Sequence, residues 1–364
     1  MLTADYLIVG SGLTGAVIAR RLADEGRDVL VLERRSHLGG NVHDHHHPCG
    51  IRVHTYGPHY FRTSREDVWE FVTRFSSFDP YEAIVQTYVD GQHENWPVAA
   101  SLVRRLVGEQ WQCNDGGDGK NFEEASLAMM PRVIYDKFVR PYTLKQWGID
   151  PQELGADLAR RFDVRADGEP RLTPNHRHQG IPSEGYAVWM GHMLQSIPVV
   201  LHCDYLQHRE QFQARKRLVF TGPIDELFGF SLGKLMYRAQ RREHEYLPDT
   251  DWHQPCGQVN NPDPAYGDHI RTLEWKHMLP GEYAKRIRGT VITRETTCTP
   301  TDSGDYEYPI PEAANRALYQ RYREMADADE QLLVCGRLGE YRYYDMDHAI
   351  ARAMELAADL LAAD

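Results

Sequence analysis

Tyr6-Leu7-Ile8-Val9-Gly10-Ser11-Gly12-Leu13-Thr14-Gly15 is the stretch of sequence that decides the fold. Its four apolar residues predict a buried strand, and a GxGxxG spacing follows them directly. Residues 13–25 then repeat apolar side chains at helical spacing, and Asp28-Val29-Leu30-Val31-Leu32-Glu33 predicts a second buried strand. A strand, a helix and a strand within about 30 residues predict a right-handed βαβ unit that binds a dinucleotide. There the glycines let backbone N–H groups reach a pyrophosphate at the helix N-terminus, and Glu33 is placed for a ribose hydroxyl.

The residues after the second strand indicate which dinucleotide is bound. Glu33-Arg34-Arg35 leads into a second glycine turn, Leu38-Gly39-Gly40-Asn41. This ExR…GG pattern resembles FAD proteins of the glutathione-reductase-like class, so we expect FAD rather than NAD. The expected cofactor contacts in this part of the chain are Gly10, Gly12, Leu13, Thr14, Gly15, Glu33, Arg34, Gly40 and Asn41.

Composition narrows the class of protein. The 364 residues are 41% hydrophobic and 26% charged, which is ordinary for a globular protein with a sizeable core. A net charge of -12 argues against a nucleic-acid partner, which a basic face would attract. The six cysteines form no CxxC pair, no signal peptide is evident, and no apolar stretch approaches about 18 residues. We therefore expect a reduced, cytoplasmic protein without a membrane span.

The remaining pattern predicts an interrupted nucleotide-binding domain. Val68 to Ala159 is mostly helical in pattern, with helical segments expected near Phe122–Met129 and Leu154–Arg161. Residues 235–310 alternate like an antiparallel sheet, and Leu332-Leu333-Val334-Cys335-Gly336 predicts a strand that rejoins the first sheet. We expect an α/β fold with a discontinuous Rossmann-like FAD-binding domain over 1–64, 185–235 and 325–364. A helical domain over 65–165 and an antiparallel sheet over 166–184 and 236–324 would be inserted into it. The cluster His43-Asp44-His45-His46-His47 predicts an exposed loop and no metal site, since contiguous histidines rarely give ligand geometry.

Several collinear segments carry a more specific resemblance. They are VHTYGPHYF (53–61), YTLKQWG (142–148), QGIP (179–182), TGPID (221–225), IRTLEWKH (270–277) and GRLGEYRYYDM (336–346). Together they closely resemble the UDP-galactopyranose mutase family. The resemblance implies a redox-neutral isomerase that needs reduced FAD, with an external reductant such as NAD(P)H. In that family the flavin N5 attacks the anomeric carbon of a nucleotide sugar, expels the diphosphate, and the sugar recloses as a furanose. A homodimer is also implied.

The resemblance assigns roles to particular residues. Arg161 and Arg271 would hold the diphosphate, whose charge suits the fork of a guanidinium group. The other implied diphosphate-side residues are Tyr308, Tyr343 and Asp345, and the implied cofactor contacts are His59, Gly222, Arg337, Asp345 and Met346. Phe138 and Tyr142, four apart on one helix face, would sandwich the base, with Thr143 and Trp147 beside them on the substrate loop. From spacing alone, surface arginines and core aromatics are the simpler accounts of these residues.

Four departures from the family pattern leave the substrate open. Arg62 replaces a histidine near the sugar, Arg171-Leu172-Thr173 lacks an expected tyrosine, Glu82-Ala83 lacks an expected asparagine, and Pro141 replaces a glycine. UDP-galactopyranose is the expected substrate, with UDP-N-acetylgalactosamine or a GDP-sugar as alternatives. Arg62 is a long donor that could contact the substrate, for example an N-acetyl carbonyl; the role of Arg171 is open. The rival functions are an FAD oxidoreductase of the amine-oxidase kind and a non-catalytic binding protein.

Overall fold

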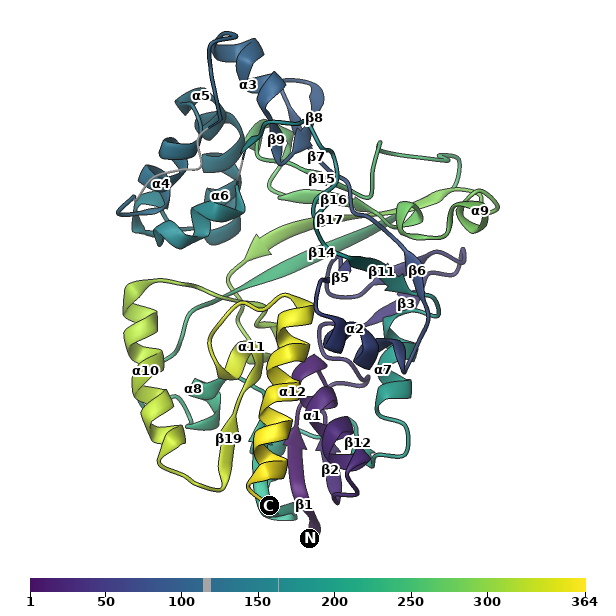
Figure 1. The fold of residues 1–364 in the computed structure, drawn as a ribbon, viewed down its shortest axis with the longest axis vertical. Coiled ribbons are helices and arrows are strands. Elements are labelled where there is room, and N and C mark those ends of the chain that lie inside the picture. The colour runs from purple at the N-terminus through teal and green to yellow at the C-terminus, as the bar shows by residue number, and fades with distance from the viewer. Residues whose placement is uncertain (114–118, 163) are drawn as a thin grey trace.

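The computed structural model describes residues 1–113, 119–162 and 164–364, apart from the side chains of Arg160 and Arg161. Its lower half in Figure 1 is built on a five-stranded parallel sheet in the order β12-β2-β1-β13-β19. The strands are β1 (Leu2–Val9), β2 (Val29–Leu32), β12 (Val199–Val200), β13 (Phe212–Phe220) and β19 (Leu332–Val334). The late strand β19 thus rejoins the sheet begun by β1, as the sequence predicts, with β13 lying between them.

Two helices from opposite ends of the chain cover one face of this sheet. Helix α1 (Leu13–Asp24) is the crossover between β1 and β2, and α12 (Met346–Ala362) lies beside it (Figure 1). The helix α1 comes very close to β1, because a Cβ on Gly15 would lie 2.0 Å from the carbonyl oxygen of Gly10. Only glycine permits this approach, which brings the helix N-terminus to the end of the strand.

A second, seven-stranded sheet crosses the middle of the molecule in Figure 1, in the order β18-β14-β17-β16-β15-β7-β8. Its strands are β7 (Val85–Val89), β8 (Gln92–Trp96), β14 (Tyr237–Leu247), β15 (Gln258–Asn260), β16 (Arg271–Glu274), β17 (Thr290–Cys298) and β18 (Tyr308–Pro309). Neighbouring strands are antiparallel except β15 and β7, which run parallel.

The segment expected to form a helical domain, residues 65–165, also contains the strands β7 and β8. They make a hairpin whose two-residue turn is Asp90-Gly91, with positive φ values of 52° and 78°. Asp-Gly between alternating residues is a strong hairpin signal, and Val85, Thr87 and Val89 alternate into the interior. The sequence contains this local turn signal, but nothing in it indicates that β7 pairs with β15, far along the chain.

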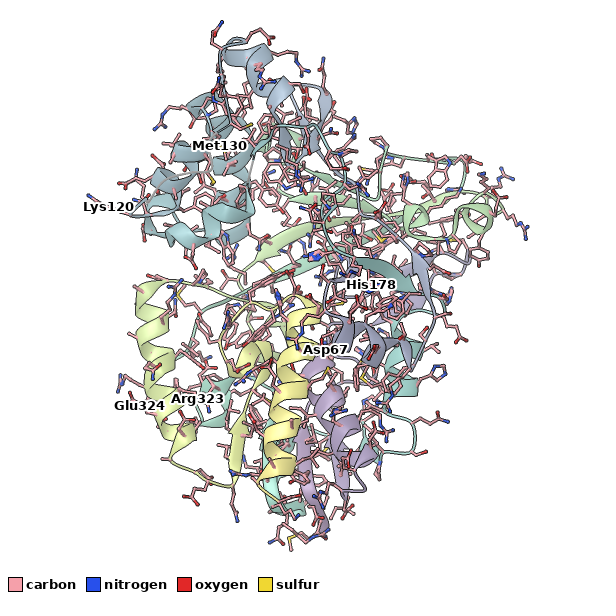
Figure 2. All side chains as sticks on the ribbon, viewed as in Figure 1. Asp67, Lys120, Met130, His178, Arg323 and Glu324 are labelled. Atoms are coloured by element: carbon pink, nitrogen blue, oxygen red, sulfur yellow. The ribbon has the colours of Figure 1, made fainter. Side chains whose placement is uncertain are left out.

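The helices of the inserted segment gather at the top of Figure 1 around a core of their own. They are α3 (Ala100–Val107), α4 (Phe122–Met129), α5 (Arg132–Ile134), a π-helical turn (Tyr135–Val139) and α6 (Arg140–Trp147). Met130, labelled among these helices in Figure 2, is one of the core side chains. The expected helix near 154–161 is instead a 3₁₀-helix, Ala156–Arg161.

The remaining elements lie around and between the two sheets. They are β3 (Asp44–His46), β4 (Arg52–His54), β5 (Phe61–Thr63), β6 (Phe78–Pro80), β9 (Val98–Ala99), β10 (Val164–Arg165), β11 (His178–Pro182), α2 (Glu66–Thr73), α7 (Tyr186–Met193), α8 (Ile224–Leu227), α9 (Gly281–Ala284), α10 (Ala313–Asp327) and α11 (Gly336–Gly339). On α10, Glu324 points outward, whereas Arg323 turns inward and donates to the carbonyl oxygen of Val334 (Figure 2). Helix α10 packs on α8 and β19, so it belongs with the first sheet and not with the inserted one.

The histidine cluster is a strand and not the expected loop. Asp44–His46 pairs with β4, and the Asp44 carboxylate accepts from the backbone N–H groups of Tyr186 and Ala187 at 2.7 and 2.9 Å. Asp44 therefore stabilises the N-terminus of α7, where a carboxylate is favoured. No helix in the described part of the chain is both long and apolar enough to cross a bilayer.

Candidate functional site

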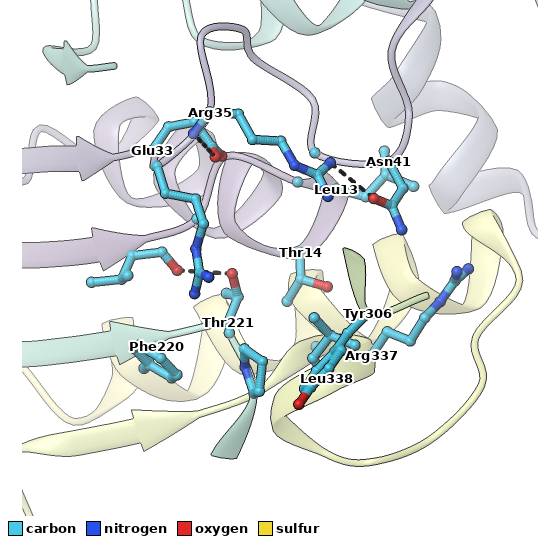
Figure 3. Close-up of a pocket in the computed structure, with 18 of the residues that line it drawn as sticks. Leu13, Thr14, Glu33, Arg35, Asn41, Phe220, Thr221, Tyr306, Arg337 and Leu338 are labelled. Atoms are coloured by element: carbon cyan, nitrogen blue, oxygen red, sulfur yellow. Dashed lines mark hydrogen bonds between the residues drawn. The ribbon is translucent and has the colours of Figure 1, made fainter. Parts of the chain in front are cut away.

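A long cavity opens at the carboxyl ends of β1, β2 and β13, where ligands of open α/β sheets bind. Its empty space is about 1190 Å³, with open solvent at the mouth included. Figure 3 shows Leu13 and Thr14 on one side of it and Tyr306, Arg337 and Leu338 on another. The expected cofactor residues that line it are Gly10, Gly12, Leu13, Thr14, Glu33, Arg34, Gly40, Asn41, His59, Gly222, Arg337 and Met346. Gly15 and Asp345 do not line it.

The glycine turn fits a dinucleotide pyrophosphate. Helix α1 begins after Gly12 without a side-chain cap, so its first N–H groups remain available to a ligand. A Cβ at Gly12 would meet nothing within 4 Å, which marks open space above the helix N-terminus. At Gly10 the φ is +101° and a Cβ would lie 2.1 Å from Thr221 Oγ1. The chain therefore combines a bare helix end with an open approach, as a phosphate group requires.

Glu33 holds the glycine turn in place. It is 4% exposed, and one carboxylate oxygen accepts from the N–H and the hydroxyl of Ser11 at 2.8 and 2.6 Å. The other oxygen accepts from the backbone N–H of Arg35 at 2.9 Å (Figure 3). The sequence predicted a ribose contact for Glu33, and the structure adds this supporting role.

Two arginines after β2 connect the edge of the cavity to segments far along the chain, helix α8 and the loop at residues 303–306. Arg34 pairs with Glu226 at 2.9 Å, and Arg35 donates to Asn41 Oδ1 at 2.9 Å and to the carbonyl oxygen of Gly304 at 3.0 Å. The Arg35 guanidinium also lies 4.2 Å from the centre of the Tyr56 ring. Sequence reasoning missed the contribution of residues 303–306, which carry no glycine-rich or charged motif.

Arg337 connects this cavity to a group of tyrosines. Its guanidinium carbon lies 5.0 Å from the ring centre of Tyr343 and 6.0 Å from that of Tyr308. The two rings stack with centres 6.2 Å apart, and Arg337 donates to the carbonyl oxygen of Tyr344 at 2.9 Å. Burial, and then Glu307, raises the pKa of Tyr308 to about 12, so its hydroxyl stays protonated and can donate.

Arg271, whose positive charge acts on Tyr308, belongs to a buried network of charges. Its Nε bonds one oxygen of Glu295, which is 0% exposed, and Nε of Arg242 bonds the other at 2.8 Å. Burial alone would raise the pKa of the Glu295 carboxyl, but Arg271 and Arg242 lower it below its usual value. Glu295 is therefore ionised and orients Arg271. Glu295 and Arg242 escaped sequence analysis because both stand in charged stretches that carry no motif.

His59 is held as a neutral ring near Arg337. Its Nδ1 donates to the carbonyl oxygen of Gly57 at 2.8 Å, which leaves Nε2 as an acceptor, and its backbone N–H donates to Nδ1 of His54 at 3.1 Å. Burial, and then the charge of Arg337, lowers the pKa of His59 to about 3. At neutral pH this imidazole can accept a hydrogen bond but does not supply a proton.

The expected base-binding residues are less exposed than a binding role requires. Phe138, Thr143 and Trp147 are 2%, 0% and 9% exposed and belong to the interior of the helical segment. Tyr142 is partly exposed and lies near Trp96, with ring centres 6.5 Å apart. The structure does not bring Phe138 and Tyr142 together on an open pocket, because Phe138 packs into the core. The side chain of Arg161 lies outside the described part of the chain.

Two of the departures from the family pattern compensate each other. Arg171 pairs with Glu82 at 2.8 Å, so the two replacements meet in one ion pair, and Arg171 also pairs with Glu169. Arg62 pairs with Asp345 at 3.2 Å, just before α12. Its guanidinium is thus already engaged by a carboxylate. Pro141 stands in the first turn of α6, where proline is tolerated.

Comparisons with known proteins agree with this geometry. A family model described as UDP-galactopyranose mutase matches residues 137–343, and one described as an NAD(P)-binding Rossmann-like domain matches residues 8–75. A probable UDP-galactopyranose mutase from Klebsiella pneumoniae is 31% identical over 98% of this chain and 94% of its own length. A dTDP-fucopyranose mutase from Escherichia coli is 31% identical over 96% of this chain and 97% of its own.

Solved structures support the fold. The structure of a reduced UDP-galactopyranose mutase superimposes with a TM-score of 0.74, covering 99% of this chain and 96% of that one, at 15% identity. That of a protein from Exiguobacterium described as a putative protoporphyrinogen oxidase gives 0.62 at 11% identity. At such identities the likeness shows the fold alone. The family match and the curated relatives, however, span the site residues, and the chain therefore belongs to the UDP-galactopyranose mutase family and is an isomerase.

Proposed function

We propose that this protein interconverts the pyranose and furanose forms of a nucleotide sugar with reduced FAD as its cofactor. The observation that carries the proposal is the continuity of two sites. Arg337 lines the dinucleotide cavity and lies beside the stacked rings of Tyr308 and Tyr343, and Tyr308 is close enough to Arg271 for that charge to act on its pKa. A cofactor ring near Arg337 and a diphosphate beside Arg271 would be neighbours. UDP-galactopyranose is the first candidate substrate, because a relative at 31% identity is named for it.

The residues have distinct tasks in this reaction. The bare N-terminus of α1 and Arg337 would hold the FAD pyrophosphate, and Glu33 fixes the glycine turn that presents those N–H groups. When bound, reduced flavin supplies a nucleophilic nitrogen for the anomeric carbon. The guanidinium of Arg271 and the protonated hydroxyl of Tyr308 donate to the diphosphate, and both contacts strengthen as the leaving group gains charge.

The second candidate substrate is a dTDP-linked sugar. The relative named dTDP-fucopyranose mutase is as similar to this chain as the Klebsiella relative, at 31% identity. The departures at Arg62, Glu82 and Arg171 alter charges where the family pattern places substrate contacts, and they leave UDP-N-acetylgalactosamine and a GDP-sugar as further candidates. Arg62 pairs with Asp345, whose neighbour Met346 lines the cofactor cavity.

The test is a substrate panel with the purified protein. The bound cofactor is identified by its absorbance and by release on denaturation, and FAD is expected. The dithionite-reduced protein is then given each of the four nucleotide sugars, and the products are separated by chromatography. We expect ring contraction of one nucleotide sugar only in the reduced state. Oxygen consumption in proportion to product would favour an oxidoreductase, and a colourless protein that refuses FAD would refute the proposal.

Arg271 gives the sharpest single test of the site. Arg271→Ala should lower the turnover rate at least about a thousandfold. The loss of one preorganised donor lowers kcat by a factor of about 10²–10³, and the diphosphate also loses a charge partner. Bound flavin should remain, because Arg271 does not line the dinucleotide cavity. Substantial residual activity would contradict the assigned role. The physiological reductant, with NAD(P)H expected, the homodimer and the cytoplasmic location stay predictions.

A further inference from the structure

Four charged side chains of alternating sign form a continuous chain inside the seven-stranded sheet. Arg242 on β14 donates through Nη1 and Nη2 to the two oxygens of Glu307, at 2.9 and 2.8 Å. Through Nε it donates to Glu295 on β17 at 2.8 Å, and Glu295 in turn accepts from Nε of Arg271 on β16. The side chains of Arg242, Glu295 and Glu307 are at most 8% exposed. The chain therefore runs from Glu307 in the interior to the diphosphate arginine.

Strand register holds this arrangement. Arg242 and Glu295 are direct partners across β14 and β17, and Glu295 and Arg271 are direct partners across β17 and β16. Three neighbouring strands thus place three charges in one row on the same face of the sheet. The turn before His59 rests on this row, because a Cβ on Gly57 would lie 2.8 Å from Glu295 Oε1 and 3.6 Å from Arg271 Nη2.

Each of the two carboxylate oxygens of Glu295 is bonded by a different arginine. Oε1 is bonded by Arg242, and Oε2 is bonded by Arg271. Arg271 is therefore held through Nε only, and within the described residues its two Nη nitrogens have no protein hydrogen-bond partner. These are the nitrogens with which a guanidinium group binds a phosphate in a bidentate manner. Without Arg242, the carboxylate of Glu295 could turn and bind Nε and Nη of Arg271 together.

We propose that Arg242, fixed by Glu307, is a positioning residue that keeps the Nη nitrogens of Arg271 available to the substrate diphosphate. This inference rests on the proposed function. It gives the buried Arg242–Glu307 pair a function. Stability alone does not explain why this pair is present, since a buried ion pair is often no more stabilising than apolar residues of similar volume. Arg242 does not touch the substrate; it acts through Glu295.

The test measures binding of UDP, dTDP and GDP to the FAD-loaded protein by titration calorimetry, and the nucleotide that the unsubstituted protein binds is then used for every variant. Arg242→Met should weaken binding about 10-fold, which corresponds to about 1.4 kcal/mol. In an Arg271→Ala background, the same substitution should cause no further loss, because its effect passes through Arg271. Equal losses in both backgrounds would show a merely structural role and overturn the inference. Bound flavin is measured in every variant.

Matched variants guard against trivial explanations. Arg241→Met alters the neighbouring arginine of β14, whose side chain is 65% exposed, and should leave nucleotide binding unchanged. If Arg242→Met alone does not fold because Glu307 is left buried without a partner, Arg242→Met with Glu307→Gln removes both charges and should show the same 10-fold loss. Wild-type affinity in that double variant would overturn the inference. Failure of the unsubstituted protein to bind any of UDP, dTDP and GDP would overturn the proposed function itself, and the inference with it.

Discussion

Replacing Gly57 by alanine should damage the protein in two separable ways. Gly57 has a φ of +90°, a conformation that costs an L-residue about 1–2 kcal/mol. A Cβ there would also lie 2.8 Å from Glu295 Oε1 and 3.2 Å from Arg242 Nη2. Neither atom can move freely, because Glu295 Oε1 is bonded by Arg242 Nε and Arg242 Nη2 is bonded to Glu307, both in buried ion pairs. Weakening one charged hydrogen bond costs about 1.5–3 kcal/mol, so the total loss should be roughly 2.5–5 kcal/mol.

Gly91→Ala is the matched control for this substitution. Gly91 has a φ of +78°, but a Cβ there would meet nothing within 4 Å. It should therefore show the backbone cost alone, about 1–2 kcal/mol. Urea denaturation of all three proteins in the same excess of FAD gives the two differences in unfolding free energy. A difference of less than about 0.5 kcal/mol between the two alanine variants would refute a tight contact between the His59 turn and the charged row, since it falls well short of the charged hydrogen bond's cost.

Two further outcomes follow from buried groups. Glu33→Gln should lower flavin affinity and stability by about 1–3 kcal/mol, because an amide cannot accept from both Ser11 and the Arg35 N–H. The loss of affinity is measured as the retention of FAD on dialysis, with the exposed Glu25→Gln as the control. Unchanged retention in Glu33→Gln would contradict this prediction. Acid should destabilise the protein below about pH 6.5, because burial holds the pKa of His54 well below its usual value and the unfolded chain alone takes up the proton. For this one group the free energy of unfolding should fall by up to about 1.4 kcal/mol per pH unit. His54→Asn should reduce this slope in urea titrations between pH 7 and 5. An unchanged slope would show that His54 does not cause the loss of stability.

Features encoded over a few residues could be predicted well. The strand, glycine turn and helix of residues 6–25 form as expected, since the glycine spacing and the apolar period act within one supersecondary unit. Helix α4 covers the expected residues 122–129, with Asn121 accepting from the N–H of Glu124 at its start. The family resemblance likewise rests on short segments, and it singled out Arg271, Tyr308 and Tyr343, whose roles stay predictions.

Contacts between distant residues could not be predicted. The β7–β8 hairpin had a local turn signal, yet only tertiary structure places β7 beside β15. Glu82 and Arg171 each looked like an isolated departure, and only the fold shows that they form one ion pair. Phe138 has the spacing of a base-binding aromatic, but packing against the helical core decides that it is buried.

By itself the sequence determined a dinucleotide-binding unit at the start of the chain and membership of a mutase family, because both are written in short, ordered motifs. Only the tertiary structure decided how Arg271 is held. Arg242, Glu295 and Arg271 come from three separate strands, and their pairing is set by sheet register. A charged residue in sequence gives no sign of its partner, because an ion pair depends on distance and burial, which the folded chain alone supplies.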